Sequence, residues 1–421
     1  MQTGLRQGSA CPPGSRRARR AVTRWLADPQ VRSAAGLWLA SKAMLAVLAW
    51  AASWVMRPAG QAAPLWAAWE HWDAAQFRLI AERGYGRLAG SDRIAFLPGF
   101  PLLLRAAHLL IGSWAADELV VTSAASFLAV LGLIRLADDC RPGSGTRAAV
   151  FLLASPAAVF LSVGYSEAAF LAAALPAWRA ARAGRWTRAA VLAAVACAIR
   201  VSGIFVLAGL AVLAVQEVTS GLPAAARDAT SRSRGAPGAA RTGPPAAVRR
   251  PAAARSLGLA ARLAIPLLPL AAYEAYLYRG TGDWLAWDHA ERAGWGRYFG
   301  DPVRTFTTTW RAAFGLEFRP PLAFMFQLEL AAMAVLAGTA AWLAWRRRWA
   351  EAVYAALTVA AFGFGTWYES VPRALLLMWP LWCGLAGLAG RRRLAGWLWL
   401  AVSAPLMVVT ALLYLSGSWA G

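Results

Sequence analysis

The residues best placed to do chemistry are His71, Trp72 and Asp73, which follow the first long apolar segment of the chain. A carboxylate beside a membrane span suits general-base catalysis, because it can take the proton from an attacking hydroxyl group. The alternative is structural, since Asp73 with Gln76 three residues later fits a capping box that opens an amphipathic helix. The two roles are compatible, because one carboxylate oxygen can cap while the other faces substrate. Asp73 is therefore a candidate catalytic base, and His71 and Trp72 beside it are candidate substrate contacts.

Three more charged residues stand beside apolar segments. Glu167 follows Ser166 at a helix start, where it either complements the helix dipole or faces a substrate sugar. Arg200 lies between apolar runs, so it either contacts a ligand in a wet cavity or extends to the membrane surface. Arg373 either pairs with Glu369 four residues earlier or binds a lipid phosphate through its planar guanidinium.

Aromatic residues gather near these charges. Tyr85 and the segment 95–101 follow Asp73, Tyr165 directly precedes the Ser-Glu pair, and His289 lies in a tryptophan-rich stretch at 281–301. Aromatic side chains at a membrane interface often act as anchors, and their ring faces also suit sugars. Both interpretations stay open, and we include Tyr85, Tyr165 and His289 among the candidate substrate contacts.

The composition indicates the scaffold that must hold these residues. Hydrophobic residues make up 59% of the 421 residues, above the 45–50% typical of soluble domains. Several continuous apolar runs reach the roughly 18 to 20 residues that cross a bilayer as a helix. We therefore predict an all-α polytopic membrane protein, since a membrane β-barrel would show alternating rather than continuous runs.

The charge and cysteine patterns exclude several other classes. The net charge of +22 comes almost entirely from arginines clustered between apolar runs, as the positive-inside rule expects, so nucleic acid is not a predicted partner. Four dispersed cysteines and three histidines favour neither a disulfide framework nor a histidine-rich metal site. No metal ligands are predicted, and a need for a divalent cation (Mg or Mn) stays open.

The apolar runs predict about eleven spans in one helical domain with a multi-pass plasma-membrane location. A basic cytoplasmic tail at 1–32, predicted to be disordered, precedes an N-terminal module at 33–219. A basic linker at 220–257, rich in Ala, Pro, Gly and Ser, is predicted to be disordered and cytoplasmic. A second module follows at 258–421. The predicted spans are 33–56, 118–136, 147–165, 167–180, a hairpin at 187–219, 259–279, 322–344, 349–367, 374–390 and 394–416.

Long external loops at 57–117 and 280–320 follow from this topology. The apolar segment 98–112 is predicted to be a re-entrant or interfacial helix, because counting it as a span would place later basic loops on the wrong side. Four polar segments, 71–101, 165–167, 281–301 and 368–373, then share the external face. We expect a site there and a cytoplasmic N-terminus.

In their order and spacing, these segments resemble the PIG-V family of mannosyltransferases. The resemblance rests on blocks spread over about 70–380, with Phe-Leu-Pro at 96–98 and Ser-Pro at 155–156 departing from the usual Phe-Phe-Pro and Asn-Pro. The matching blocks are His71-Trp72-Asp73 with Phe77, Ile80, Ala81, Gly84 and Tyr85; 95–101; Ser155-Pro156 with Phe160 and Tyr165-Ser166-Glu167; Arg200 with Gly203; and Pro372-Arg373 with Pro380.

The resemblance implies a GT-C fold with the active site on the non-cytoplasmic face and a polyprenyl-phosphate-mannose donor. It implies inversion at the sugar carbon, with Asp73 as base, Arg200 or Arg373 on the donor phosphate, and Glu167 positioning the sugar. The acceptor would be a lipid or glycan, and the arginine- and alanine-rich composition suggests a bacterial relative. A transporter or flippase of lipid-linked sugars is the alternative function, and a non-catalytic membrane scaffold is a further one.

Overall fold

The computed structural model describes residues 23–55, 68–227 and 252–420, and every regular element in those ranges is helical. Six segments are long and apolar enough to cross a membrane, and four shorter apolar helices accompany them. The predicted all-α polytopic class is therefore confirmed, whereas the predicted count of about eleven spans is not. The six are α2 (Pro29–Trp54), α5 (Trp114–Cys140), α9 (Gly203–Ser220), the α11–α12 segment Ser256–Thr281, α15 (Pro320–Trp345) and α19 (Arg393–Leu415); the four are α4 (Gly99–Ile111), α8 (Trp186–Ile199), α16 (Trp349–Gly363) and α18 (Trp379–Ala389).

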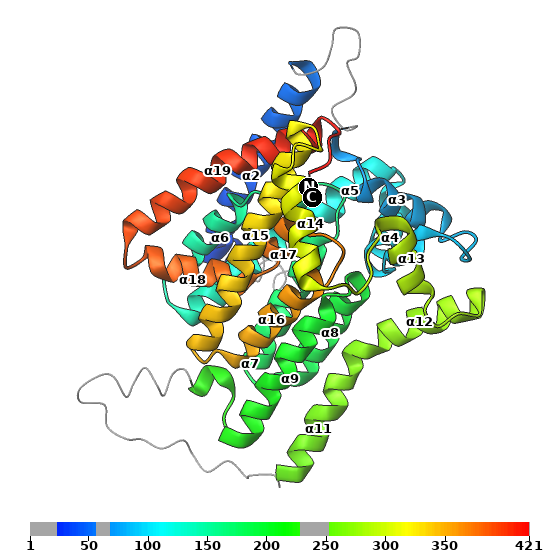
Figure 1. Cartoon of the computed structure of the whole chain (residues 1–421). Coiled ribbons are helices and arrows are strands. Elements are labelled where there is room, and N and C mark those ends of the chain that lie inside the picture. Colours follow the sequence, from blue (N-terminus) through cyan, green and yellow to red (C-terminus); the bar gives the residue numbers. More distant parts are fainter. Residues whose placement is uncertain (1–22, 56–67, 228–251, 421) are drawn as a thin grey trace, which may run out of the picture.

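Helix α7 (Glu167–Arg182) forms the centre of the bundle and packs against α5, α8 and α9 (Figure 1). Most of its 16 residues are buried, and seven of the buried ones are alanines, which let neighbouring backbones approach closely, as in other membrane bundles. Its Trp178 meets Trp379 edge to face at 5.3 Å, and Trp379 in turn stacks on Tyr354 at 4.5 Å. These three aromatic side chains join α7 to α16 and α18 in the interior of the bundle.

Two predicted spans are interrupted near prolines. The segment 147–165 is α6 (Gly145–Leu153) followed by a turn at Pro156 and the short helix η3 (Ala158–Leu161). The segment 374–390 is split into α17 (Val371–Leu376) and α18, which carries Pro380 in its first turn. Proline lacks a backbone donor and disfavours helical geometry in the residue before it, so neither segment continues as one helix. The breaks bring polar residues into the bundle.

Several predicted boundaries also shift. Helix α2 begins at Pro29, capped by Asp28, so the basic tail is already helical before residue 32. Helix α11 (Ala252–Ala264) begins inside the predicted linker, and residues 228–251 of that linker lie outside the described residues, as do residues 1–22. The predicted hairpin is confirmed as α8 and α9, with residues 200–202 at the bend.

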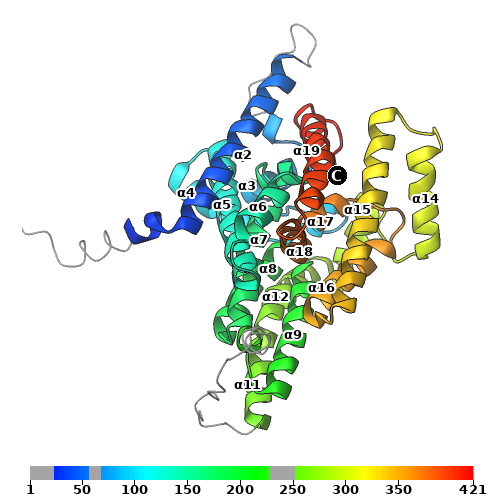
Figure 2. The ribbon, with the colours of Figure 1, turned by 90° about the vertical axis from the view of Figure 1, so that its left-hand side faces the viewer.

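Both predicted loops contain helices. The first holds α3 (Asp73–Arg83), the short helix η2 (Asp92–Ala95) and α4, and the second holds α13 (Ala286–Trp295) and α14 (Pro302–Phe314). Helix α13 packs on η2, and α14 lies along α15 at the edge of the bundle (Figure 2). The 13 residues of α4 span about 20 Å, less than the ~30 Å hydrocarbon core, and the re-entrant or interfacial placement of this helix stays a prediction.

Candidate functional site

A cleft of about 670 Å³ opens between segments that are far apart in the sequence. Its walls come from the start of α3, the α8–α9 bend, helix α13 with the residues after it, and the chain between α16 and α17. Charged and aromatic side chains share these walls. Its polar lining includes Asp73, Gln76, Ser166, Arg200, Ser202, Asp288, Glu291, Arg297, Glu369, Ser370 and Arg373, and its aromatic lining includes Trp72, Phe77, Phe96, Phe205, Trp287, Trp295, Tyr298, Phe299, Phe362, Phe364, Trp367 and Trp419.

Arg373 joins the two most informative carboxylates. Its Nη1 lies 2.9 Å from Asp73 Oδ2, and its Nε donates to Glu167 Oε1 at 2.8 Å. The guanidinium carbon also lies 4.6 Å from the ring centroid of Tyr165 and 5.1 Å from that of Phe160. These contacts fix the orientation of Arg373, so Asp73 is held at the edge of the cleft by a cation whose own position is set from behind.

Glu167 is completely buried between two arginines. Besides Arg373, it accepts a bond of 2.9 Å from Arg200 Nη1, which also donates to Ser166 Oγ at 2.8 Å. A buried carboxylate needs such compensation, because taking a charge out of water is costly unless it is paired and hydrogen-bonded. Glu167 does not line the cleft, so its place is behind the two arginines rather than against a sugar.

The backbone on either side of this ion pair is strained. Trp72, directly before Asp73, has φ 56°, and Ser370, three residues before Arg373, has φ 64°. Residues other than glycine rarely adopt such angles, and they tend to occur at functional sites. The Ser370 turn is held by Glu329 of α15, whose carboxylate accepts from the amides of Ser370 and Val371 at 2.9 and 2.8 Å.

The start of α3 is fixed by two tyrosines. The hydroxyl of Tyr165 accepts from the Asp73 amide at 3.3 Å, and the hydroxyl of Tyr414 donates to the carbonyl groups of Trp69 and His71 at 3.2 Å each. Tyr165 and Tyr414 are themselves fully buried. Asp73 is therefore supported through both its backbone and its side chain, as a catalytic group requires.

A second charged group also lines the cleft. Arg297 contacts Glu291 and Glu369, each at 3.4 Å. Burial raises the pKa of both carboxyls, and the nearby Arg297 offsets only part of that effect. Around it, Trp287, Trp295 and Trp367 contribute the flat apolar faces that suit a sugar ring or an isoprenoid chain.

The structure brings together only some of the predicted site residues. Trp72, Asp73, Arg200 and Arg373 line one cleft, whereas five others do not line it. Of those five, Tyr165 and Glu167 lie directly behind the cleft. The other three are His71, which packs on Tyr414; Tyr85, buried with its hydroxyl donating to the Phe96 carbonyl; and His289, which is exposed and paired with Asp283.

Several local interpretations are wrong. Asp73 is the first residue of α3 rather than its N-cap, and the N-cap Trp72 makes no capping bond, so the predicted capping box is absent. Arg373 pairs with Asp73 and Glu167 instead of Glu369, because the turn at Ser370 points the two side chains to different partners. Arg200 turns inward to Glu167 instead of extending to the surface.

Sequence reasoning missed Glu291, Arg297 and Glu329. An acidic residue inside the apolar run 320–345 was a usable signal for Glu329, because charges at membrane depth are costly and tend to have partners. Glu291 and Arg297 lie in the segment 281–301, which was predicted to share the external face, but within a polar segment neither charge stands out as it does in an apolar run. Within the described residues, no group of three or more His, Cys, Asp or Glu side chains could hold a metal ion. Whether the reaction needs a divalent cation stays open.

The fold and the cleft define a helical membrane protein with a carboxylate and arginines facing an aromatic-lined cavity. Residues 61–227 match the family described as Mannosyltransferase (PIG-V), and the family resemblance seen in the sequence is thereby confirmed over this part of the chain. Residues in this part include Asp73, Glu167 and Arg200, whereas Arg373 lies beyond it.

Similar curated proteins carry the name "GPI alpha-1,6-mannosyltransferase 2". The protein of Rattus norvegicus is 34% identical over 146 residues, that of Homo sapiens 34% over 147 and that of Cricetulus griseus 36% over 146. Each alignment covers 32% of this chain and 29% of the relative. The chain thus matches less than a third of these mammalian relatives, and its bacterial origin stays a prediction.

Two solved structures show a broad likeness in helix arrangement. The Archaeoglobus fulgidus oligosaccharyltransferase aligns over 91% of this chain and 56% of its own, with 11% identity and a TM-score of 0.45. ArnT from Cupriavidus metallidurans, solved with undecaprenyl phosphate, aligns over 84% and 60%, with 18% identity and a TM-score of 0.42. The function proposed next rests on the cleft and the family match alone.

Proposed function

We propose that the cleft transfers mannose from a polyprenyl-phosphate-mannose donor to a hydroxyl group of a lipid or glycan acceptor. The observation that carries this proposal is the Asp73–Arg373 pair, in which a cleft-facing carboxylate is oriented by an arginine supported from behind. A base and an anion-binding cation side by side are what transfer from a phosphosugar requires.

In this reaction the acceptor oxygen attacks the anomeric carbon and its proton passes to the Asp73 carboxylate. The bond between the anomeric carbon and the phosphate oxygen breaks, and the polyprenyl phosphate leaves with the electron pair. Arg373 and Arg200 lie where they can bind that phosphate, since guanidinium groups make charge-assisted bonds to phosphate oxygens. The tryptophans that line the cleft would hold the sugar or the lipid chain.

We place the cleft on the external face with a cytoplasmic N-terminus. The support is the charge distribution, because the arginine-rich turns at 346–348 and 391–393 lie at the ends of α15 and α18, away from the cleft-lining ends of α9, α16 and α17. Such clusters favour the cytoplasmic side.

The test is transfer of labelled mannose from polyprenyl-phosphate-mannose into lipid extract, using membranes with matched expression. Wild type should transfer, and Asp73→Asn should lose about 10²-fold or more, the contribution typical of a general base. Asp283→Asn is the matched control, since this exposed carboxylate pairs with His289 outside the cleft. Equal transfer by wild type and Asp73→Asn would remove Asp73 as base, and no transfer by wild type would contradict the donor assignment.

A further inference from the structure

Two segments that are far apart in the sequence are joined in the lining of the cleft: the end of α13 with the residues after it, and the chain between α16 and α17. The Thr366 hydroxyl donates to the Gly296 carbonyl at 3.0 Å, and the Gly300 amide donates to the Phe364 carbonyl at 2.8 Å. Five side chains of these segments that line the cleft are called the Trp367 wall. They are Glu291, Trp295, Arg297, Trp367 and Glu369.

Trp367 is fixed in place and still open to the cleft. Gly296 has φ 62°, and a Cβ atom there would lie 3.1 Å from the Trp367 ring, so the missing side chain lets the indole pack closely on the turn that ends α13. Trp367 nevertheless remains 36% exposed. In the same wall, Trp295 packs edge to face on Phe96 at 5.2 Å. Indoles held in this way offer a rigid apolar surface on which the carbon–hydrogen face of a sugar ring can pack.

The charged side chains of the Trp367 wall are held loosely. Arg297 lies 3.4 Å from both Glu291 and Glu369, whereas the two contacts of Arg373 are 2.9 and 2.8 Å. Bonds between a charged nitrogen and a charged oxygen usually measure about 2.7–2.9 Å. Glu369 Oε2 forms no hydrogen bond of good geometry among the described residues, although buried polar atoms normally have one. This oxygen is therefore suited to a hydroxyl group that a ligand supplies.

The charges of the wall define the class of that ligand. Two carboxylates share one guanidinium group, so a phosphate would meet an excess of negative charge there. Ionised carboxylates only accept hydrogen bonds and guanidinium groups only donate them. An uncharged group with several hydroxyls suits both, because one hydroxyl can donate to Glu369 and another can accept from Arg297. Together with the indoles, this composition fits a sugar ring.

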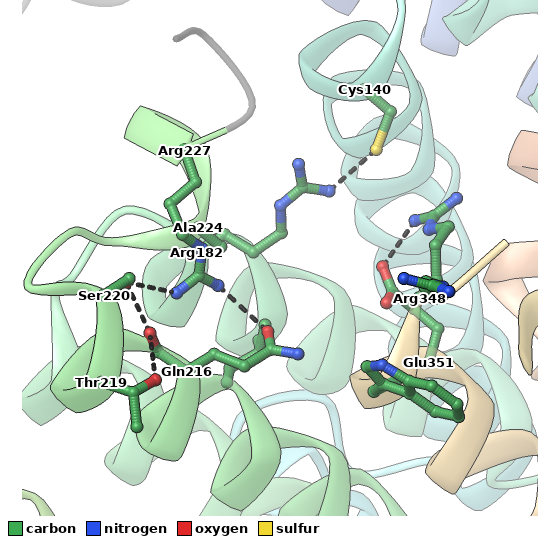
Figure 3. A pocket seen from close by; sticks show the side chains of 12 residues that line it. Cys140, Arg182, Gln216, Thr219, Ser220, Ala224, Arg227, Arg348 and Glu351 are labelled. Atoms are coloured by element: carbon green, nitrogen blue, oxygen red, sulfur yellow. Dashed lines mark hydrogen bonds and ion pairs between the residues drawn. The ribbon is translucent and has the colours of Figure 1, made fainter. Parts of the chain in front are cut away.

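A second cavity, of about 610 Å³, has a different composition (Figure 3). It is formed where α5, α7 and α9 end and where α16 begins. Its described lining contains one aromatic residue, Trp349, and one carboxylate, that of Glu351, which pairs with Arg348. The combination of several indoles with two carboxylates therefore distinguishes the cleft from this cavity, and the sugar site is assigned to the cleft.

We propose that the Trp367 wall binds a sugar ring of the acceptor, with Trp367 packed on the ring and Glu369 accepting from its hydroxyls. The inference rests on the proposed function, in which Arg200 and Arg373 bind the donor phosphate. The donor mannose carries that phosphate on its own ring, so the carboxylates of the wall disfavour it more than an uncharged acceptor. The acceptor is therefore a glycan or a glycolipid, and a lipid that offers a single alcohol is a poor substrate.

The binding test uses full-length protein in a polyoxyethylene detergent, which contributes no sugar. The probes are methyl mannoside, methyl glucoside and cyclohexanol, which carries a single hydroxyl on a six-membered ring, and saturation-transfer NMR measures each dissociation constant. A methyl glycoside should bind wild type more tightly than cyclohexanol does. Glu369→Gln should weaken glycoside binding about tenfold, the loss expected for a hydrogen bond to a charged group. Glu317→Gln is the matched control, since this exposed carboxylate does not line the cleft.

Two variants at position 367 separate ring packing from folding. Trp367→Phe keeps an aromatic ring and Trp367→Ala removes it, so glycoside affinity should decrease from wild type to Trp367→Phe to Trp367→Ala. Thermal unfolding of each variant without ligand shows whether the fold is intact. Equal affinity for cyclohexanol and the glycosides, or unchanged glycoside affinity in both Glu369→Gln and Trp367→Ala, would overturn the proposal.

Kinetics distinguish the acceptor from the donor. In transfer of labelled mannose into lipid extract, Glu369→Gln should raise the acceptor KM about tenfold and leave the donor KM unchanged. A purely structural role would change both constants, and a rise in the donor KM alone would assign the wall to the donor sugar; either result overturns the proposal. Sugar binding by a protein that transfers no mannose would remove the acceptor role together with the proposed reaction, whereas transfer without sugar binding would overturn this inference alone.

Discussion

The carboxylate of Glu329 lies 2.9 Å from the amide nitrogen of Ser370, a residue held at φ 64°. Its other oxygen accepts from the next amide, that of Val371. A carboxylate fully buried in α15 thus defines a turn whose end carries Arg373. The geometry of the candidate site depends on a residue that does not line the cleft.

The first prediction concerns this support. Glu329→Gln places an amide NH₂ against backbone donors, leaving at least one buried amide without an acceptor at a cost of about 1–3 kcal/mol. We expect a lower midpoint of thermal unfolding and slower mannose transfer, the latter because Arg373 is displaced. Glu317→Gln on the exposed surface should change neither. An unchanged unfolding midpoint in Glu329→Gln would show that the turn at Ser370 does not depend on the Glu329 carboxylate.

The second prediction concerns the type of cation at position 373. Arg373→Lys keeps the charge but cannot bond Asp73 and Glu167 together through separate nitrogens, since lysine offers a single ammonium group. Transfer should fall about 10–100-fold, in the range expected when a catalytic group is misplaced by about 1 Å. Steady-state rates on membranes with equal amounts of folded protein measure this loss. Full activity would mean that charge alone suffices.

The third prediction concerns the buried carboxylate behind the site. Glu167→Gln leaves Arg200 and Arg373 with less compensating charge, and breaking a buried ion pair typically costs 3–5 kcal/mol. The variant should unfold at a markedly lower temperature than Asp73→Asn, because the Asp73 carboxylate is partly exposed whereas that of Glu167 is buried. Thermal unfolding of both variants in the same detergent provides the comparison. A lower unfolding temperature for Asp73→Asn than for Glu167→Gln would show that Asp73 contributes more to stability.

The fourth prediction concerns pH. Burial raises the pKa of Glu291 above its usual 4.5, so the folded state holds this proton to higher pH than the unfolded chain does. The contribution of the protonated Glu291 to the free energy of unfolding is therefore fully present below pH 4.5, and it decreases as the pH rises through the raised pKa. Glu291→Gln cannot ionise, so its unfolding midpoint relative to wild type should increase with pH across that window. A constant difference would show that Arg297 compensates the charge in full.

Some of the architecture could be predicted from sequence because it follows from composition. Apolar runs indicate membrane helices wherever the run is continuous, and the bend at Arg200 was visible as a charge between two such runs. The breaks near Pro156 and Pro380 were harder to predict, because a proline in an apolar run can kink a helix without ending it. Helix α14 gave no comparable apolar run and was not predicted.

The site was predictable in its parts and not in its pairings. Asp73, Arg200 and Arg373 stood out because charges beside apolar segments are costly and tend to be used. Local spacing suggested that Arg373 pairs with Glu369 and that Asp73 caps its own helix, and neither is observed. Pairing across 300 residues is decided by how α3, α7 and α17 pack, which no local pattern contains.

The Asp73–Arg373 contact joins two parts of the chain that cannot form the candidate site separately. The segment at 61–227 that matches the family contains both carboxylates of the cluster but not the arginine that joins them. Expressed alone, it would present two acids and Arg200 with one cation missing, a half-site rather than a minimal enzyme. The part of the chain beyond residue 227 would then be an obligatory complement to that segment, and co-expression of the two halves would be needed to restore the Asp73–Arg373 pair.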